Sequence, residues 1–279
     1  MTRETQYKCR FCTICNGEKC LGEMPGMGGV ENNSNFILNY REWEKYEPAE
    51  DAVSTATMRF APVTGAEENI GYPSEGDFYR EIIRYCKKNG LEVSIGDGVP
   101  DSKLQYGIEA LQENGMKGSV FLKPYENGKL FERIEWSSSV AESVGVDIDS
   151  YNIVTMRNKA NLEKKTAAQL KEIKAHLKTP FIIKGIFTEE DLELVKEVKP
   201  DIVVISNHGG RISTRSGSTL DFLIRNRETI RNNVMEIWID GGIRRKKHLQ
   251  IAQANGASSV LIGRPVISSF LQQKTFSLQ

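Results

Sequence analysis

The sequence predicts an α/β protein built as a (β/α)8 TIM barrel with a short, irregular, cysteine-rich N-terminal extension. The length of 279 residues suits one barrel domain, because such barrels take about 250 residues. From about residue 52 onward, short apolar runs alternate with longer amphipathic ones, which is the pattern of repeated strand–helix units. We therefore expect an extension over residues 1–51 that packs on the barrel, and the barrel itself over residues 52–279.

The strands are expected at eight short runs, several of them apolar on consecutive residues, as in parallel strands covered on both faces. These runs are 58–64, 91–95, 119–124, 145–148, 181–184, 202–206, 236–240 and 259–263. Helices are expected between them, at 76–88, 103–113, 167–177 and 189–198 among others. Thr166 and Thr188 each have the spacing of a capping box, with Gln169 and Asp191 as partners. Asn-Gly pairs at 89–90, 114–115 and 255–256 stand where helices should end. Eight strands favour a closed barrel over an open doubly wound sheet.

The composition argues against nucleic-acid and membrane partners. Lysine plus arginine equals aspartate plus glutamate, at 37 each, so no net charge attracts the chain to anionic polymers or lipids. No run reaches the roughly 18 apolar residues that cross a bilayer. The first residues, MTRETQYKCRFC, lack the apolar core of a signal peptide. We therefore expect a cytoplasmic protein.

Polar residues at the predicted strand ends are the candidate site residues, because barrel chemistry lies past the C-terminal ends of the strands. The last two strands run into Asp240-Gly241-Gly242-Ile243-Arg244 and Gly263-Arg264. Glycines at such turns let backbone N–H groups approach an anion, and arginines add bidentate contacts to a phosphate. The alternative is that the glycines only make tight turns and the arginines are solvated. Two such turns after strands seven and eight favour a phosphate site.

His208 stands in a glycine-flanked turn after the sixth expected strand, three residues before Arg211. An imidazole that titrates near neutral pH suits proton abstraction, and an arginine suits the carboxylate of an anionic substrate. The other two histidines, His176 and His248, lie in polar helical stretches and are expected to be solvated. Lys184, at the end of an apolar strand, would need an anionic partner if buried, or could extend to the rim.

The segment from Pro180 to Pro265 contains IKG, SNHGGR, DGGIR and GRP, in that order. With these motifs it resembles the FMN-dependent 2-hydroxy-acid dehydrogenases and oxidases, a family that includes glycolate oxidase, lactate oxidase and flavin-dependent lactate and mandelate dehydrogenases. A weaker match extends back to Ala61-Pro62-Val63-Thr64. The resemblance implies bound FMN, which performs the redox step, and oxidation of a small 2-hydroxy acid to the 2-oxo acid.

Residue by residue, the resemblance implies the following roles. Lys184 would stabilise negative charge at the flavin N1–C2 edge, and Ser206 would contact the flavin. His208 would take the proton from the substrate's 2-hydroxyl, or from C2 if a carbanion forms, and Arg211 would bind the substrate carboxylate. The FMN phosphate and ribityl chain would contact Asp240, Gly241, Gly242, Arg244, Gly263 and Arg264, and the ring would lie against Ala61, Pro62 and Val63.

The first half of the chain departs from this family pattern. The third strand offers Phe121 and Lys123 where the family usually has a glutamine and a tyrosine. The fourth strand supplies Asp147 and Asp149, of which we expect Asp149 to orient His208. Arg157 is the candidate for a second substrate arginine. The resemblance also implies a homo-oligomer, whose electron acceptor could be oxygen, a quinone or a redox protein.

Four of the five cysteines, Cys9, Cys12, Cys15 and Cys20, form a C-x2-C-x2-C-x4-C cluster that the family pattern lacks. In a protein without export signals, such a cluster favours metal or redox chemistry over disulfides. Four thiolates could bind zinc, which would stabilise the extension, or an iron–sulfur cluster, which could pass electrons from the flavin. Four free thiols are the third interpretation. The fifth cysteine, Cys86, lies in the helix expected at 76–88 and is expected to be a small, packed side chain.

Two other functions remain open. Type 2 isopentenyl-diphosphate isomerase shares the FMN barrel and a related histidine turn but catalyses no net redox change. Arg211, which directly follows His208-Gly209-Gly210, favours a carboxylate over a diphosphate substrate. The chain could also be a flavin-binding electron-transfer or regulatory protein without hydroxy-acid turnover.

Overall fold

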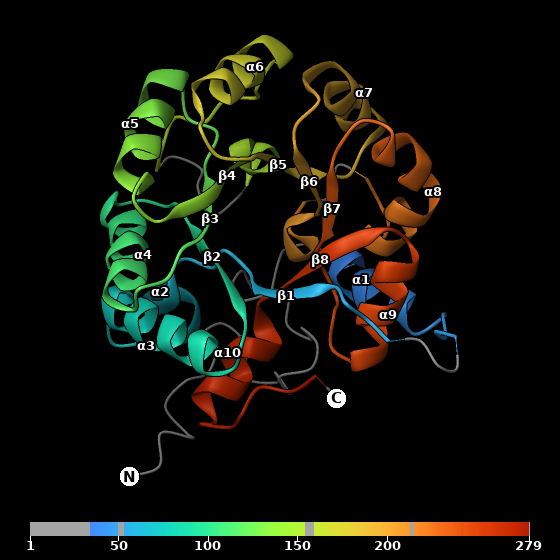
Figure 1. Ribbon diagram of the computed structural model, residues 1–279, viewed down its shortest axis with the longest axis horizontal. Coiled ribbons are helices and arrows are strands. Elements are labelled where there is room, and N and C mark those ends of the chain that lie inside the picture. Colours follow the sequence, from blue (N-terminus) through green and yellow to red (C-terminus); the bar gives the residue numbers. More distant parts are fainter. Residues whose placement is uncertain (1–33, 50–52, 154–158, 213–214, 279) are drawn as a thin grey trace.

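The computed structural model describes residues 34–49, 53–153, 159–212 and 215–278. Eight parallel strands form a closed barrel in sequence order, and β1 pairs with β8 to complete it (Figure 1). The strands are β1 (Thr57–Phe60), β2 (Glu92–Gly96), β3 (Gly118–Leu122), β4 (Ala141–Asp147), β5 (Phe181–Ile186), β6 (Ile202–Ile205), β7 (Glu236–Ile239) and β8 (Ala257–Ile262). The predicted barrel and all eight predicted strands are therefore confirmed.

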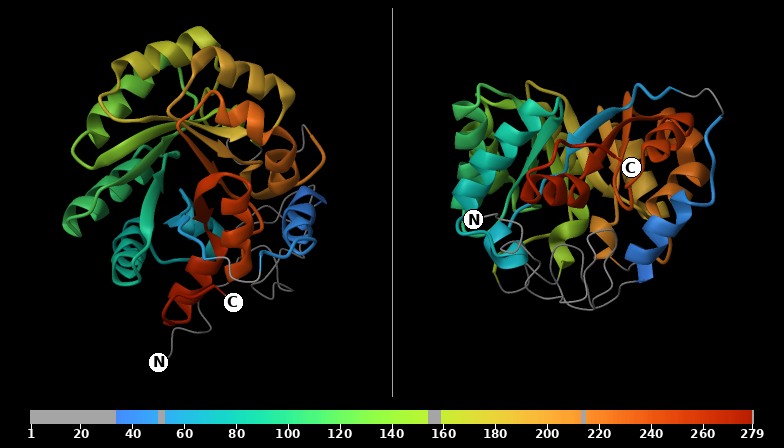
Figure 2. Two further views of the ribbon diagram at one scale, coloured as in Figure 1. Left: turned by 45° about the vertical axis from the view of Figure 1, so that its right-hand side comes forward. Right: turned by 90° about the horizontal axis from the view of Figure 1, so that it is seen from below.

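Helices surround the barrel, so the strands are covered on their outer face (Figures 1 and 2). They are α2 (Ala66–Ile70), α3 (Glu75–Lys88), α4 (Ser102–Glu113), α5 (Asn127–Ser137), α6 (Ala167–His176), α7 (Glu189–Val198), α8 (Thr219–Arg231), α9 (Lys246–Ala254) and α10 (Arg264–Leu271). Two short 3-10 turns, η2 (Ile148–Asn152) and η4 (His208–Gly210), follow β4 and β6. Within the described residues, no helix combines the length and apolar character needed to cross a membrane.

The helix ends form as local sequence predicts. Thr166 and Thr188 each accept the backbone N–H three residues later, and the side chains of Gln169 and Asp191 return the contact. These are capping boxes, which satisfy donors that a helix N-terminus otherwise leaves unpaired. Gly90, Gly115 and Gly256 adopt positive φ after their asparagines, as expected at helix C-termini.

The extension was expected to be irregular, but its described part contains a helix, α1 (Ser34–Trp43). Helix α1 packs against η4 and α8, which places it beside the C-terminal half of the barrel (Figure 2). The expected boundary between extension and barrel falls at residues 50–52, outside the described residues.

Two apolar layers build the core. The larger fills the space between the strands and the surrounding helices, and it includes Cys86, which is buried as predicted. The smaller lies inside the barrel and consists of Phe121, Ile182, Ile202, Val204, Trp238 and Leu261. Side chains alternate between the two faces of a strand, so the residue two positions beyond each inward-facing one also points inward. The positions two residues beyond Phe121, Ile182, Val204 and Trp238 are polar: Lys123, Lys184, Ser206 and Asp240. Asp147, two residues beyond Gly145, joins them. The strand period therefore gathers these residues at one end of the barrel.

Candidate active site

A cavity of about 340 Å³ opens at the C-terminal ends of the strands. Its volume lies within the range of about 300–1,000 Å³ usual for ligand and cofactor sites. The lining comes from the segments after β1, β2, β4, β6, β7 and β8, from Phe36 of α1, and from Lys123 and Lys184. This is the position where barrel enzymes carry out their chemistry.

Two lysines share one carboxylate at the floor of this cavity. Asp147 Oδ1 lies 2.8 Å from Lys184 Nζ, and Asp147 Oδ2 lies 2.9 Å from Lys123 Nζ. Burial disfavours the charged carboxylate, but His208, Lys123 and Lys184 together hold the pKa of Asp147 well below its usual range. Burial likewise opposes the charge of Lys184, yet Asp147 and then Asp240 raise its pKa. Lys184 is therefore a buried cation with the anionic partner that its position required.

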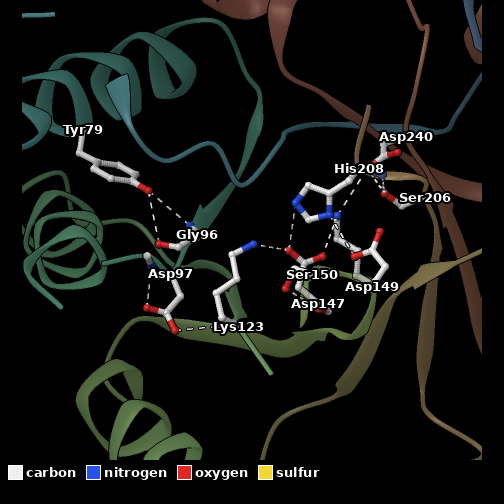
Figure 3. A network of polar contacts seen from close by, with 12 residues as sticks. Tyr79, Gly96, Asp97, Lys123, Asp147, Asp149, Ser150, Ser206, His208 and Asp240 are labelled. Carbon is white, nitrogen blue, oxygen red and sulfur yellow. Dashed lines mark hydrogen bonds and ion pairs between the residues drawn. The ribbon is translucent and has the colours of Figure 1, made fainter. Parts of the chain in front are cut away.

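His208 contacts two carboxylates (Figure 3). Its Nδ1 lies 3.0 Å from Asp149 Oδ1, and its Nε2 lies 3.5 Å from Asp147 Oδ2. The structure thus brings together His208 and the aspartate expected to orient it, although the role of that aspartate stays a prediction. A carboxylate on Nδ1 favours the tautomer with the proton on that nitrogen, which would leave Nε2, the atom nearer Asp147, to act as a base.

The turn that carries His208 has an unusual backbone. Three successive residues, His208, Gly209 and Gly210, have φ values of 56°, 65° and 90°. A side-chain-bearing residue is disfavoured in this left-handed region, so the surroundings must hold it there. Asn207 Oδ1 accepts the Gly210 N–H at 2.9 Å, and Ser206 Oγ accepts the His208 N–H at 3.2 Å.

Ser206 also connects this turn to the end of β7. Its hydroxyl donates to Asp240 Oδ2 at 2.7 Å, and Lys184 Nζ lies 3.8 Å from the same oxygen. Burial raises the pKa of Asp240, an effect that Lys184 and Ser206 oppose. Ser206, Asp240 and Lys184, three of the expected cofactor contacts, are thus joined in one network.

The glycine–arginine turns line the same cavity, and close packing against α1 also requires glycine at two of their positions. Gly241 and Gly242 adopt φ values of 92° and 79°. A Cβ on Gly242 would lie 2.3 Å from the backbone oxygen of Asn39, and one on Gly241 would lie 2.9 Å from the Asn39 side chain. Helix α1 therefore passes directly over this turn and leaves no room for larger residues. The sequence interpretation, which explained the glycines by anion approach or a tight turn alone, missed this contact.

Two further features make this end of the cavity suitable for an anion. Arg244 and Arg264 both line it, and the Arg264 guanidinium lies over the Phe36 ring at 4.5 Å. Helix α10 begins here at Gly263–Arg264, and no side chain among the described residues caps it. A helix N-terminus beside arginines is a common phosphate-binding arrangement.

His248 corrects an expectation. It was expected to be solvated, yet its side chain is completely buried. Its Nδ1 accepts the Arg244 N–H at 3.1 Å, and its ring stacks on Trp43 with centroids 5.3 Å apart. Burial lowers the pKa of His248 to about 4, against the attraction of Glu44, which raises it. His248 therefore supports the turn after β7 as a neutral side chain. The prediction failed because α1, which covers this helix face, was not recognised as a helix.

The remaining site predictions divide into two groups. Ala61, Pro62, Val63 and Arg211 all line the cavity, as expected for residues that contact cofactor or substrate. Arg157 lies outside the described residues, and so do the four cysteines Cys9, Cys12, Cys15 and Cys20. Sequence reasoning noted Lys123 and Asp147 but did not foresee that Asp147 joins both lysines.

The residues of the cavity fit FMN. One end offers arginines and a helix N-terminus for a phosphate, and the middle offers apolar surface from Pro62, Val63 and Leu261 for a flat ring. Lys184, which also lines the cavity, supplies a buried positive charge. A phosphorylated, partly apolar and electron-accepting cofactor requires this set of groups.

Comparison with known proteins agrees with this arrangement. Residues 103–273, more than half of the chain, match the family model described as FMN-dependent dehydrogenase. A 2-hydroxyacid oxidase of Dictyostelium discoideum is 41% identical over 98 residues, which cover 35% of this chain and 25% of that protein. An L-lactate oxidase of Nostoc is 40% identical over 88 residues, covering 32% of this chain and 24% of that protein. The matches thus span about a quarter of the length of these relatives.

Solved structures show the same fold. Mandelate oxidase superposes with a TM-score of 0.70 at 19% identity, covering 89% of this chain and 81% of that one. The flavin-binding domain of baker's yeast flavocytochrome b2 gives 0.70 at 20% identity, with coverages of 88% and 71%. The fold and site define a flavin-type (β/α)8 barrel. The chain belongs to the FMN-dependent dehydrogenase family, as its motifs predicted.

Proposed function

We propose that this protein is an FMN-dependent enzyme that oxidises a small 2-hydroxy acid, of the lactate or glycolate kind, to the 2-oxo acid. The observation that carries the proposal is the pairing of His208 with Asp149 in the cavity that Arg211 and the two glycine–arginine turns also line. A base, a carboxylate-binding cation and a phosphate site in one cavity are the groups that this reaction needs. Family membership and the names of the relatives support the same activity.

In the proposed reaction, His208 Nε2 takes a proton from the substrate. Asp149 on Nδ1 holds the ring in place and stabilises the imidazolium that forms. Arg211 binds the substrate carboxylate through two parallel hydrogen bonds and so fixes the reacting carbon near the base. Arg157 is proposed as a second arginine for the same carboxylate.

The cofactor contacts follow from the same positions. FMN, when bound, supplies the electron-accepting ring. Lys184 would stabilise negative charge at the N1–C2 edge, because Asp147 and Asp240 keep its ammonium group charged. Ser206 would contact the ring, which would lie against Ala61, Pro62 and Val63. The phosphate and ribityl chain would be held by Asp240, Gly241, Gly242, Arg244, Gly263 and Arg264.

Anaerobic mixing of the yellow holoprotein with lactate or glycolate tests the activity. Bleaching of the flavin absorbance is expected, because the substrate's two electrons enter the ring. An isomerase of the isopentenyl-diphosphate type, or an electron-transfer protein without turnover, would leave the colour unchanged with every hydroxy acid tried. Oxygen, a quinone or a redox protein is then added separately to the reduced protein. The electron acceptor is the one with which the flavin absorbance returns fastest.

We further propose that Cys9, Cys12, Cys15 and Cys20 bind a metal, as zinc or an iron–sulfur cluster. Four thiolates at this spacing match the ligand sets of both. Elemental analysis of anaerobically purified protein tests the proposal, and a variant with all four cysteines replaced by serine is the control. Finding neither zinc nor iron in the wild-type protein would leave only free thiols. A cytoplasmic location and a homo-oligomer complete the proposal, and light scattering measures the oligomeric state.

A further inference from the structure

Helix α1 presents a buried polar face to the barrel. Asn35, Asn39 and Trp43 are spaced by four residues, so they lie on one side of the helix. Their exposures are 1%, 1% and 0%. Burial of amide and indole groups is unfavourable unless they are hydrogen-bonded. Asn35 reaches the segment after β6, and Trp43 reaches the turn after β7. Asn39, between them, contacts both.

Asn39 forms a reciprocal amide pair with Asn207, the residue before His208. Asn39 Nδ2 donates to Asn207 Oδ1 at 2.8 Å, and Asn207 Nδ2 donates to Asn39 Oδ1 at 3.1 Å. Asn207 Oδ1 also accepts the Gly210 N–H, which donates to the Asn207 backbone oxygen as well, and these two bonds close the left-handed turn around His208. Asn39 therefore fixes the orientation of the amide that holds this turn.

The same side chain reaches the turn after β7. Asn39 Oδ1 accepts the Thr219 N–H at 3.0 Å, and Thr219 Oγ1 donates to the backbone oxygen of Asp240 at 2.6 Å. One turn further along α1, Trp43 donates to the backbone oxygen of Gly241 at 2.8 Å. The close approach of the Asn39 backbone to Gly242 completes the contact.

We propose that Asn39 is a positioning residue that fixes the His208 turn relative to the anion-binding turn Asp240–Arg244. The inference rests on the proposed function, in which the base must stand at a set distance from a substrate held against the cofactor. Asn39 contacts neither the proposed substrate nor the proposed cofactor. It acts through its hydrogen bonds to Asn207 and Thr219. Displacement of a catalytic group by about 1 Å can lower a rate about 100-fold, so loss of this link has a measurable cost.

Asn39→Asp is the sharpest test, because it changes the volume very little. The carboxylate still accepts from Thr219, but it places a second acceptor opposite Asn207 Oδ1. At a pH where the new carboxyl is ionised, the Asn207 amide relieves this by turning its Nδ2 toward the new carboxylate oxygen, which takes its Oδ1 away from the Gly210 N–H. Asn35→Asp is the matched control, since Asn35 is as buried and contacts the backbone of Ile212, Arg215 and Gly217 instead.

Two measurements on holoprotein decide the matter. In Asn39→Asp, amide hydrogen exchange over residues 206–211 should be at least about fivefold faster than in wild type, as for loss of one buried hydrogen bond. Its kcat should fall about 10- to 100-fold with KM changed by less than about threefold. Asn35→Asp should change neither quantity to this extent. If Asn39→Asp does not fold, Asn39→Ser is measured in its place with the same expectations.

Unchanged exchange and unchanged kcat in the Asn39 variant would overturn the proposal, and so would equal effects in the Asn35 control. The exchange measurement needs no turnover. If wild-type protein oxidises no hydroxy acid, the proposed function fails, while exchange over residues 206–211 still decides whether Asn39 holds the His208 turn.

Discussion

Nδ1 of His208 lies 3.0 Å from Oδ1 of Asp149. The backbone of β5 holds the carboxylate in that position, because Asp149 fills the space beside Gly185. The proposed base is therefore oriented by a side chain that is itself held by a strand. A site supported in this way tolerates little change in either the ring or its support.

Replacement of His208 should abolish turnover and leave the flavin bound. His208→Ala removes the proton acceptor, which contributes typically about 10²–10⁴-fold to a rate. Flavin absorbance of the purified variant and steady-state kcat measure the two effects separately. His176→Ala is the control, since that histidine is half-exposed and stacks on Phe131. Wild-type turnover in His208→Ala would exclude His208 as the base.

Gly185→Ala should lower turnover by displacing Asp149, the residue that contacts His208, without contacting His208 itself. A Cβ at this position would stand 2.6 Å from Cγ of Asp149, so the carboxylate must move away from the imidazole. The expected result is a fall in kcat of about 10- to 100-fold. Because Gly185 has a φ of 100°, alanine also adds backbone strain of about 1–2 kcal/mol.

Gly90→Ala separates those two effects. Gly90 also has a positive φ, 65°, but a Cβ there would meet nothing within 4 Å. It should lower the melting temperature like Gly185→Ala and leave kcat at the wild-type value. A kcat equal to wild type in Gly185→Ala would show that the position of Asp149 does not matter for turnover.

The parts of the fold that local sequence determines were predictable. The apolar strands are read directly from consecutive residues such as Phe181–Ile183, and the capping boxes at Thr166 and Thr188 mark helix starts. His208 and Arg211 stand out because a short motif contains both. Lys184 could be placed in the site because it ends an apolar strand.

Other features depend on contacts between residues far apart in sequence. The pairing of Asn39 with Asn207 joins positions 168 residues apart, and nothing near Asn39 indicates a partner. His248 looked solvated because its neighbours are polar, whereas Trp43 and Glu44 of the extension cover it. Asp147 could have been placed inward from its strand period, two residues after Gly145, but its two lysine partners come from β5 and from the end of β3.

Arg211→Lys should weaken substrate binding more than catalysis. A lysine keeps the positive charge but cannot form two parallel hydrogen bonds with a carboxylate. Loss of one such bond is expected to raise KM about tenfold, with a smaller fall in kcat. Arg225→Lys is the control, because Arg225 is exposed and pairs with Asp221 on α8. Equal KM values in wild type and Arg211→Lys would assign the substrate carboxylate to another residue.

Burial of His248 predicts that stability falls in mild acid. Its pKa is about 4 in the folded protein, whereas a histidine in the unfolded chain titrates near about 6.5. At a pH above the pKa of the unfolded chain, His248 is neutral in both the folded and the unfolded state, so its burial costs no stability. Between the two values only the unfolded chain takes up the proton, and stability decreases as the pH falls. The loss is complete below the lower value, with an upper limit of about 3–4 kcal/mol.

Urea unfolding of wild type and His248→Asn, at neutral pH and at about pH 5, measures this contribution. Asparagine offers an acceptor close to the position of Nδ1, so the Arg244 N–H can stay paired, but it does not titrate. Groups that do not contact residue 248 titrate alike in both proteins, and their effects cancel in the difference. Glu44 is the exception, because His248 helps to lower its pKa. Wild type should therefore lose more free energy of unfolding than His248→Asn on acidification. A difference that stays constant across this range would mean that His248 takes up its proton equally in the folded and unfolded states, which would contradict its burial as a neutral side chain.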